Sequence, residues 1–278
     1  IETIGYGGIE QKVQERRQDD YYQYNVNAGI DLGKLLPEKA NTVIPVRYSL
    51  SHEIINPKYN PLDKDIKLKD ALEATATKEQ RDSILDVAQD MTMTQSLSVP
   101  GIRVGITSKE GPRPWDPANF QVSFSFNKQK NADPTTEYEN TSDYRGSFQY
   151  SYNPYIKGLK PFGWIKSKSK HLKFFKDWEL NWMFNSLTFY TNISRYYYEQ
   201  QTRSEIDTYF QLPVQVSKNF NWDRQLSLTW NLTKSLNFSF SSNTTARIEE
   251  SLGAVNKKLF PDKYKEWRDT VWNSIKGF

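Results

Sequence analysis

The side chains that most often do chemistry in proteins are scarce in this chain, and their spacing assembles no catalytic site. Its 278 residues include no cysteine and only two histidines, His52 and His171. A thiolate nucleophile, a disulfide, a cysteine-ligated metal and a three-histidine metal centre are therefore all excluded. Ser51 precedes His52, but neighbouring strand residues point to opposite faces, so this pair does not make a nucleophile and its base. We expect no catalytic residue, no metal site and no enzyme activity.

Two further motifs carry polar groups without the partners that their chemistry needs. Asp63, Asp65 and Asp70 lie close together, but the central glycine and terminal glutamate of an EF-hand loop are missing. Gly5-Tyr6-Gly7-Gly8 is not followed by the Gly-Lys-Ser/Thr of a phosphate-binding loop. These segments are best explained as a solvated loop and a turn, so we expect no cofactor.

The charge balance argues against a nucleic-acid partner. Lys plus Arg number 37 and Asp plus Glu 33, which leaves a net charge of +4. That excess is too small to indicate nucleic-acid binding. One dense basic segment, 166–176, contains five lysines and His171 beside Trp164. Because it leads into a predicted strand, contact with anionic lipid headgroups fits it better than single-stranded nucleic acid, and a solvated loop fits equally well.

The dominant pattern is alternation of apolar and polar residues with a period of two, which is typical of strands with one wet face. It is clearest between positions 22 and 32, where the odd positions are polar or glycine. The apolar members of that run are Tyr22, Tyr24, Val26, Ala28, Ile30 and Leu32. Similar runs recur at 44–50, 91–99, 120–126, 148–152, 178–184, 187–193, 210–216, 226–232 and 236–240.

These runs predict about ten strands, many of them long enough to cross a membrane at a tilt. Aromatic residues make up 14% of the chain, and many lie near the ends of the runs, where interfacial rings are expected. No run of apolar residues exceeds three, which excludes a transmembrane helix but not alternating strands. The predicted fold class is all-β: a segment of an antiparallel transmembrane β-barrel. A large soluble antiparallel sandwich is the alternative, since its strands also alternate.

Two segments break the alternation and have helical spacing. Residues 66–89 place apolar residues at helical intervals among many charges. Residues 262–275 begin with Asp262 as a candidate N-cap, and Tyr264, Trp267, Val271 and Ile275 share one face. We expect both to be helical insertions within a single barrel segment that spans residues 1–278.

Several loop sequences resemble the SprA/Sov family. They are Ile4-Gly5-Tyr6-Gly7-Gly8-Ile9, Val43-Ile44-Pro45-Val46 with Ile54-Ile55-Asn56-Pro57-Lys58-Tyr59-Asn60-Pro61-Leu62-Asp63, and the late blocks Asn221-Trp222-Asp223-Arg224, Trp230-Asn231-Leu232-Thr233-Lys234-Ser235-Leu236 and Ala246-Arg247-Ile248-Glu249-Glu250. They follow one another in order along nearly the whole chain.

The resemblance implies a role in an outer-membrane protein-conducting channel. That family forms the outer-membrane translocon of the type 9 secretion system, and some members are tied to gliding motility. Its members form one very large barrel, so the resemblance implies that this chain is one piece of the wall. It further implies passage of folded cargo through a wide lumen and a lateral gate, a plug protein and a smaller accessory barrel as partners, and the bacterial outer membrane as the location.

On this hypothesis the two faces of each strand have different surroundings. We expect the lumen to be lined by Gln23, Asn25, Asn27, Gln121, Ser123, Ser125, Gln225, Ser227 and Thr229. We expect lipid or the accessory barrel to contact Tyr24, Val26, Ile30, Val122, Phe124, Leu226, Leu228 and Trp230. Two alternatives remain: a self-contained small outer-membrane barrel that acts as an enzyme or adhesin, and a soluble carbohydrate-binding β-sandwich.

Overall fold

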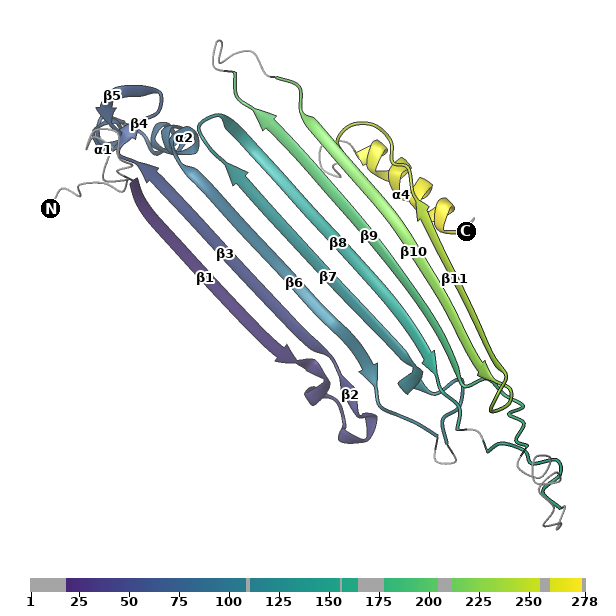
Figure 1. The fold of residues 1–278 in the computed structure, drawn as a ribbon. Helices are drawn as coiled ribbons and strands as arrows, with labels where there is room; N and C mark the ends of the chain where they lie inside the picture. The colour runs from purple at the N-terminus through teal and green to yellow at the C-terminus, as the bar shows by residue number, and fades with distance from the viewer. Residues whose placement is uncertain are drawn as a thin grey trace, which may run out of the picture.

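The computed structural model describes residues 19–108, 111–155, 157–164, 178–204, 212–255 and 261–276. Its dominant feature is one broad antiparallel sheet in which long strands follow each other in chain order (Figure 1). The alternating residues pair strand to strand without a crossover, as expected for hairpin-connected strands. The all-β prediction is confirmed, and the described sheet is open, with β1 and β11 at its two edges.

Eight long strands build this sheet. They are β1 (Asp19–Asp31), β3 (Pro45–Pro57), β6 (Asp90–Val104), β7 (Phe120–Ala132), β8 (Thr136–Tyr152), β9 (Ser186–Thr202), β10 (Gln215–Asn231) and β11 (Asn237–Arg247). The short β2 (Thr42–Val43) pairs with the end of β6. Three short 3₁₀ helices, η2 (Leu32–Leu35), η3 (Glu38–Ala40) and η4 (Pro117–Asn119), lie in connections at one end of the sheet, which we call the lower end.

The opposite, upper end carries the helices. The connection from β3 to β6 contains a small hairpin, β4 (Tyr59–Asn60) and β5 (Asp63–Lys67), followed by α1 (Leu68–Glu73) and α2 (Lys78–Ala88). The segment after β11 leads to α4 (Pro261–Lys276). Both stretches with helical spacing thus contain helices and emerge at the same end of the sheet (Figure 1). No helix among the described residues is long and apolar enough to cross a membrane.

The strand pattern differs from the sequence expectation in number and in length. The strand predicted at 178–184 is wrong, because its described residues contribute only an isolated bridge between Leu180 and Leu159. The run at 210–216 falls partly outside the described residues, and β10 begins only at Gln215. Conversely, β8 begins at Thr136, twelve residues before the run that predicted it. Its upper half is polar on both faces, so alternation could not reveal it, whereas backbone pairing continues regardless of side-chain type.

Almost no hydrophobic core exists. Among the described residues, only Leu68, Ala88, Tyr152, Phe220 and Ile248 are buried hydrophobics. A single sheet with two open faces buries little surface by itself, so its apolar face requires an external cover. Large apolar side chains stay exposed along that face, including Tyr24 at 60% and Ile30 at 55%.

Candidate functional site: the two faces of the sheet

The strand register sorts side chains onto two chemically different faces. Directly paired residues of antiparallel strands lie on the same face, so each pairing carries the assignment across the sheet. Gln23 pairs with Glu53, and the same row continues through Thr92 and Asn131 to Glu139. By this rule all nine residues expected to line a lumen share one face, here called the polar face, and all eight expected to contact lipid or a partner share the other, the apolar face.

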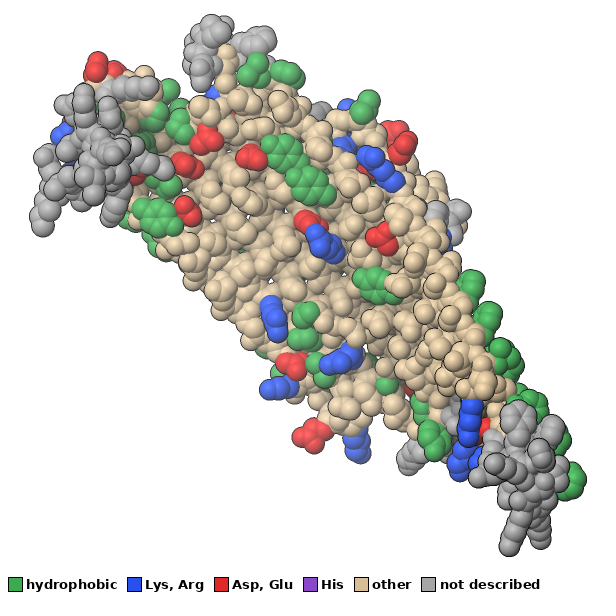
Figure 2. Space-filling view, in the orientation of Figure 1, with side chains coloured by type: hydrophobic (Ala, Val, Ile, Leu, Met, Phe, Trp, Pro, Cys, Tyr) green, Lys and Arg blue, Asp and Glu red, His purple; other side chains and the backbone are tan. Residues whose placement is uncertain are grey.

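The polar face is rich in hydroxyl and amide groups. Figure 2 views this side, where most of the broad surface is neither hydrophobic nor charged. The hydroxyls of Ser49 and Ser96 lie 2.7 Å apart across β3 and β6. The Arg145 guanidinium donates to the Asp143 carboxylate at 2.8 Å, and shallow hollows of about 400 and 260 Å³ flank Arg145. Such a surface binds water well and offers a passing protein few sticky apolar contacts.

His52 and Ser51 do not come together on either face. The register places His52 on the apolar face opposite Tyr24, and Ser51 on the polar face opposite Asn25. Among the described residues, no group of three or more His, Cys, Asp or Glu side chains has the arrangement of a metal site. The segment Gly5–Gly8 and the basic segment 166–176 lie outside the described residues.

The apolar residues form a band that crosses the strands obliquely. On β1 the band covers 22–30 and is centred on Val26. On β10 it covers 222–230, is interrupted by Arg224 and is centred on Leu226. The register leads from Val26 across the sheet to Lys218 of β10, eight residues before Leu226. Eight residues span about 27 Å along a strand, and the six steps from β1 to β10 span about 29 Å across the sheet. The band therefore makes an angle of about 43° with the rows of paired residues.

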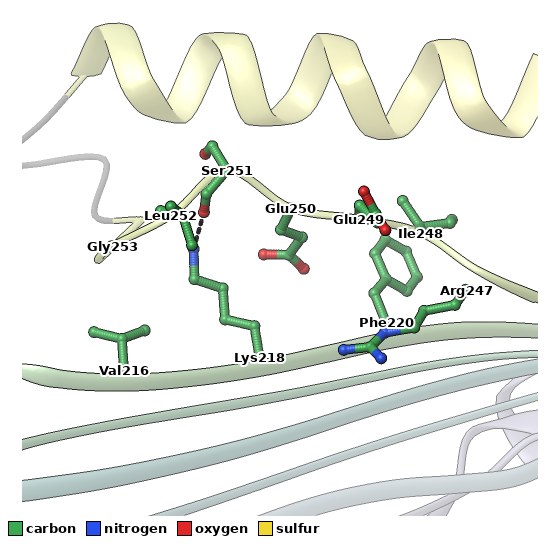
Figure 3. A pocket seen from close by; sticks show the side chains of 10 residues that line it. All are labelled: Val216, Lys218, Phe220, Arg247, Ile248, Glu249, Glu250, Ser251, Leu252 and Gly253. Carbon is green, nitrogen blue, oxygen red and sulfur yellow. Dashed lines mark hydrogen bonds between the residues drawn. The ribbon is translucent and has the colours of Figure 1, made fainter.

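Above the band on β9 and β10, the apolar face carries charges, and the chain covers them itself. Residues 248–253, here called the strap, leave the end of β11 and cross between β10 and α4 (Figure 3). The Arg195 guanidinium of β9 donates to both carboxylate oxygens of Glu250, at 2.6 and 2.8 Å. The Lys218 ammonium of β10 donates to the Ser251 carbonyl at 2.7 Å. The Glu250 side chain is only 2% exposed, so this ion pair is shielded from water.

Helix α4 completes this cover. Its half-buried residues Tyr264, Trp267 and Val271 follow helical spacing, and the Trp267 ring lies 4.6 Å from the Arg195 guanidinium. At the start of the strap, Ile248 donates its backbone N–H to the Phe220 carbonyl, and the side chains of Ile248 and Phe220 are buried. The Arg195 guanidinium, the Glu250 carboxylate and the Trp267 ring thus lie together in one cluster, here called the charged centre.

At the lower end, a loop is held by one carboxylate. Asp116 is 3% exposed and accepts hydrogen bonds from the backbone N–H groups of Arg113 and Ser108 and from the Ser108 hydroxyl. These donors, the Arg113 N–H first, lower the pKa of the Asp116 carboxyl. The loop between β6 and β7 is therefore fixed by hydrogen bonds to an anion rather than by apolar packing.

Comparison with known proteins identifies the relationship of the N-terminal part. Residues 1–72 match a family model described as SprA_N, a motility related/secretion protein. The predicted kinship with the SprA/Sov family is confirmed. The SprA_N match covers β1, β3 and the first turns of the upper insertion. A search of curated proteins gave no match. The relationship to secretion proteins suggests a membrane-associated location.

Sequence reasoning missed the charged centre on the apolar face of this SprA/Sov relative. Arg195 and Glu250 are far apart in sequence, and they meet only because the strap folds back over the sheet. A weak signal existed. Within β9 and β10, Arg195 and Lys218 have the same parity as the apolar residues, which marks them as polar groups on the apolar face.

Proposed function

We propose that this chain forms part of the wall of an outer-membrane protein-export channel. The observation that carries the proposal is the oblique apolar band. A bilayer is a flat slab, and strands that cross it at a tilt must expose apolar residues in a band oblique to their hydrogen-bonded rows. The angle of about 43° agrees with the roughly 35–45° tilt of transmembrane barrel strands. A soluble sandwich has no reason to align its apolar residues with an external plane.

The width of the band supports the same conclusion. It covers residues 22–30 on β1 and 222–230 on β10, or nine residues on each strand, with Arg224 as a charged residue inside the span on β10. A tilted strand needs about 9–11 residues to cross the hydrocarbon layer. Several rings mark its margins, among them Tyr22 at the upper margin of β1 and Trp230 at the lower margin of β10. Rings of this kind favour the interface between lipid and water.

The two sheet edges favour a wall larger than the described sheet. β1 offers a 13-residue edge and β11 an 11-residue edge, and neither strand contains proline or lysine. Soluble proteins protect such long edges with charges, prolines or covering elements. Unprotected edges of this length are suited to pairing with further strands, so we propose that this sheet is one arc of a wider barrel.

The polar face would then line the passage. Its serine, asparagine, glutamine and threonine side chains hydrogen-bond to water and leave no adhesive patch for a cargo protein. By analogy with the SprA/Sov family, the partners are exported proteins, a plug protein, a smaller accessory barrel and outer-membrane lipid. We propose a passive structural role without catalysis, a cofactor or nucleic acid.

Because the natural chain lacks cysteine, single cysteines can test this arrangement in intact cells. Ser227→Cys and Leu228→Cys are adjacent residues of β10 on opposite faces. We expect a water-soluble maleimide to label S227C at least tenfold faster than L228C, and a lipid-soluble maleimide to reverse that order. Equal labelling of both positions by the water-soluble reagent would disprove a lipid-facing band.

A second pair of cysteines separates an arc from a small closed barrel. Asn25→Cys on β1 and Ser241→Cys on β11 lie on the two sheet edges and on the same polar face. A barrel closed by these two strands would bring such cysteines within disulfide distance. We expect no oxidation product that joins them within one molecule, and an efficient bond between them would establish the self-contained barrel instead.

A further inference from the structure

The lysines of the sheet are confined to one face and one level. In the eight long strands that the structure describes, lysine occurs only at Lys128, Lys130 and Lys218. Lys128 pairs with Ser142, which pairs with Tyr197, which pairs with Lys218, so all four lie in one row of the apolar face. Lys130 lies one row above. The polar face has no strand lysine, although it contains most of the polar side chains.

On β7, the two lysines lie immediately above the apolar band. Below them, the same face of the strand presents Phe126, Phe124, Val122 and Phe120 in succession. The Phe126 ring packs against the Tyr144 ring of β8 with centroids 4.8 Å apart, directly beneath the lysine row. An aromatic row capped by flexible cations matches the chemistry of the bilayer interface, where rings lie near the glycerol level and ammonium groups reach the phosphates.

The chain satisfies the cations at this level on β9 and β10, but not those on β7. Arg195 has the Glu250 carboxylate and Lys218 has the Ser251 carbonyl. Within the described part of the chain, neither Lys128 nor Lys130 has a carboxylate within ion-pair distance. Lys130 is exposed and Lys128 half-buried, so both ammonium groups are accessible from outside the sheet.

Nearby neutral groups complete a surface suited to an anion. Ser142 lies opposite Lys128, and Asn140 lies opposite Lys130, both on β8. The nearest acidic side chain in these rows, Glu199 of β9, already accepts hydrogen bonds from Asn140 at 3.0 Å and from the Tyr197 hydroxyl at 2.7 Å. Its charge is thus engaged by the sheet itself.

We propose that Lys128 and Lys130 form a binding site for the phosphate of an anionic outer-membrane lipid. This inference rests on the proposed function, because it requires the apolar face to contact the bilayer. The acyl chains of the bound lipid would lie along the phenylalanines of β7, and the two ammonium groups would hold its phosphate at the upper boundary of the band. The strap and α4 close the corresponding level on β9 and β10, which leaves β7 as the strand whose lysines in this part of the sheet can reach lipid.

The test compares lipid retention by the intact protein and by two charge-matched variants. Protein purified in neutral detergent would be titrated with dioctanoyl phosphatidylglycerol and examined by native mass spectrometry. Dioctanoyl phosphatidylcholine and inorganic phosphate serve as parallel probes. We expect K128Q/K130Q to bind phosphatidylglycerol about 30-fold more weakly, since each of the two interfacial lysines contributes on the order of 1 kcal/mol. K69Q/K78Q, which removes two lysines from α1 and α2, should bind like the natural protein.

Each outcome bears on a separate claim. Conservative K128R/K130R should retain phosphatidylglycerol, which separates a charge effect from misfolding. Equal affinity of K128Q/K130Q and the natural protein would overturn the lipid site, even if cysteine labelling still placed the band in lipid. If K128Q/K130Q weakens the binding of inorganic phosphate as much as the binding of phosphatidylglycerol, the lysines form a site for free anions, and the proposal would also be overturned. If S227C and L228C label alike, the wall function fails regardless of the lysine result.

Discussion

The apolar face is covered in two different ways at its two ends. On β1, large apolar side chains are exposed, and no described residue covers them. On β9 and β10, the strap and α4 lie over the face and bury Phe220 and Ile248. The difference follows the cations: the covered region contains Arg195 and Lys218, whereas the described residues of β1 include no lysine or arginine. On β9 and β10, the chain supplies its own partners to Arg195 and Lys218.

On the proposed function, one sheet meets both lipid and water on the same side. Above the oblique band, a strand leaves the proposed hydrocarbon layer and can carry charge where carboxylates, carbonyls or water satisfy it. Below that boundary, the same face is largely apolar, with Arg224 of β10 as an exception. On this proposal, intramolecular cover belongs to the first region and lipid contact to the second.

The largest expected effect comes from breaking the covered region. Glu250→Ala leaves the Arg195 guanidinium beneath the strap without its carboxylate, and loss of one partner of a buried pair costs about 3–5 kcal/mol. Because the pair joins two segments, the cost should appear as release of the strap and α4. Hydrogen exchange of residues 248–255 in the intact protein should rise, while exchange in β1 and β3 stays unchanged.

A double variant provides the control for that experiment. R195L/E250L removes both charges and keeps apolar bulk, so it should restore most of the protection that E250A loses. If E250A leaves exchange in the strap unchanged, the ion pair does not hold the cover in place.

The next effect tests the uncovered band. Phe124→Arg places a cation in the middle of the band on β7, which should destabilise the membrane-folded state by about 2–4 kcal/mol. Ser123→Arg is the matched control, because the adjacent residue points to the polar face. The folded fraction after urea titration in lipid vesicles, read from heat-dependent gel mobility, measures both. Equal destabilisation by the two variants would remove the distinction between the faces.

The sequence predicted the band better than it predicted the strands. Alternation located most of β1, where apolar residues continue over most of the strand, but only part of β3, β7 and β11. It missed the upper half of β8, where Glu139, Asn140 and Ser142 place polar groups on both faces. Alternation in the sequence reflects a difference in polarity between the surroundings of the two faces of a strand. Backbone pairing does not depend on that difference. Alternation therefore ends where the proposed lipid layer ends, and the strand does not.

The candidate charged centre could not have been derived from pattern alone. Arg195 and Glu250 are 55 residues apart, and the strap that carries Glu250 has no periodicity that would place it over the sheet. β11 ends at Arg247, and six residues later Gly253 has a left-handed φ of 85°. The chain turns over the sheet between these two positions. Long-range contacts of this kind depend on the whole fold rather than on any local signal.

A smaller effect concerns the insertion at the upper end of β3 and β6. Thr77 caps α2 by accepting the Gln80 backbone N–H, so Thr77→Ala should cost about 1 kcal/mol of local helix stability. Ser83→Ala, an exposed change within the same helix, should be neutral or slightly stabilising. Hydrogen exchange in α2 would report both. If T77A also raised hydrogen exchange in the strap, the insertion that contains α2 and the strap would not be independent. The comparison between the two ends of the sheet would then need revision.

The smallest effect at ordinary pH is expected in the lower loop between β6 and β7. Donation from the Arg113 N–H, and from Ser108, lowers the pKa of the Asp116 carboxyl, so the ionised form stabilises the folded loop. This contribution is fully present above the ordinary carboxyl pKa and is lost as the pH falls through the lowered value. Loop exchange, corrected for intrinsic rates, should thus stay constant from pH 8 to about pH 5 and rise only in stronger acid. Asp116→Asn should expose the loop at every pH and abolish that acid transition, whereas the strap, held by a different pair, should not respond to this substitution. An acid transition that persists in D116N would show that another carboxyl controls the loop.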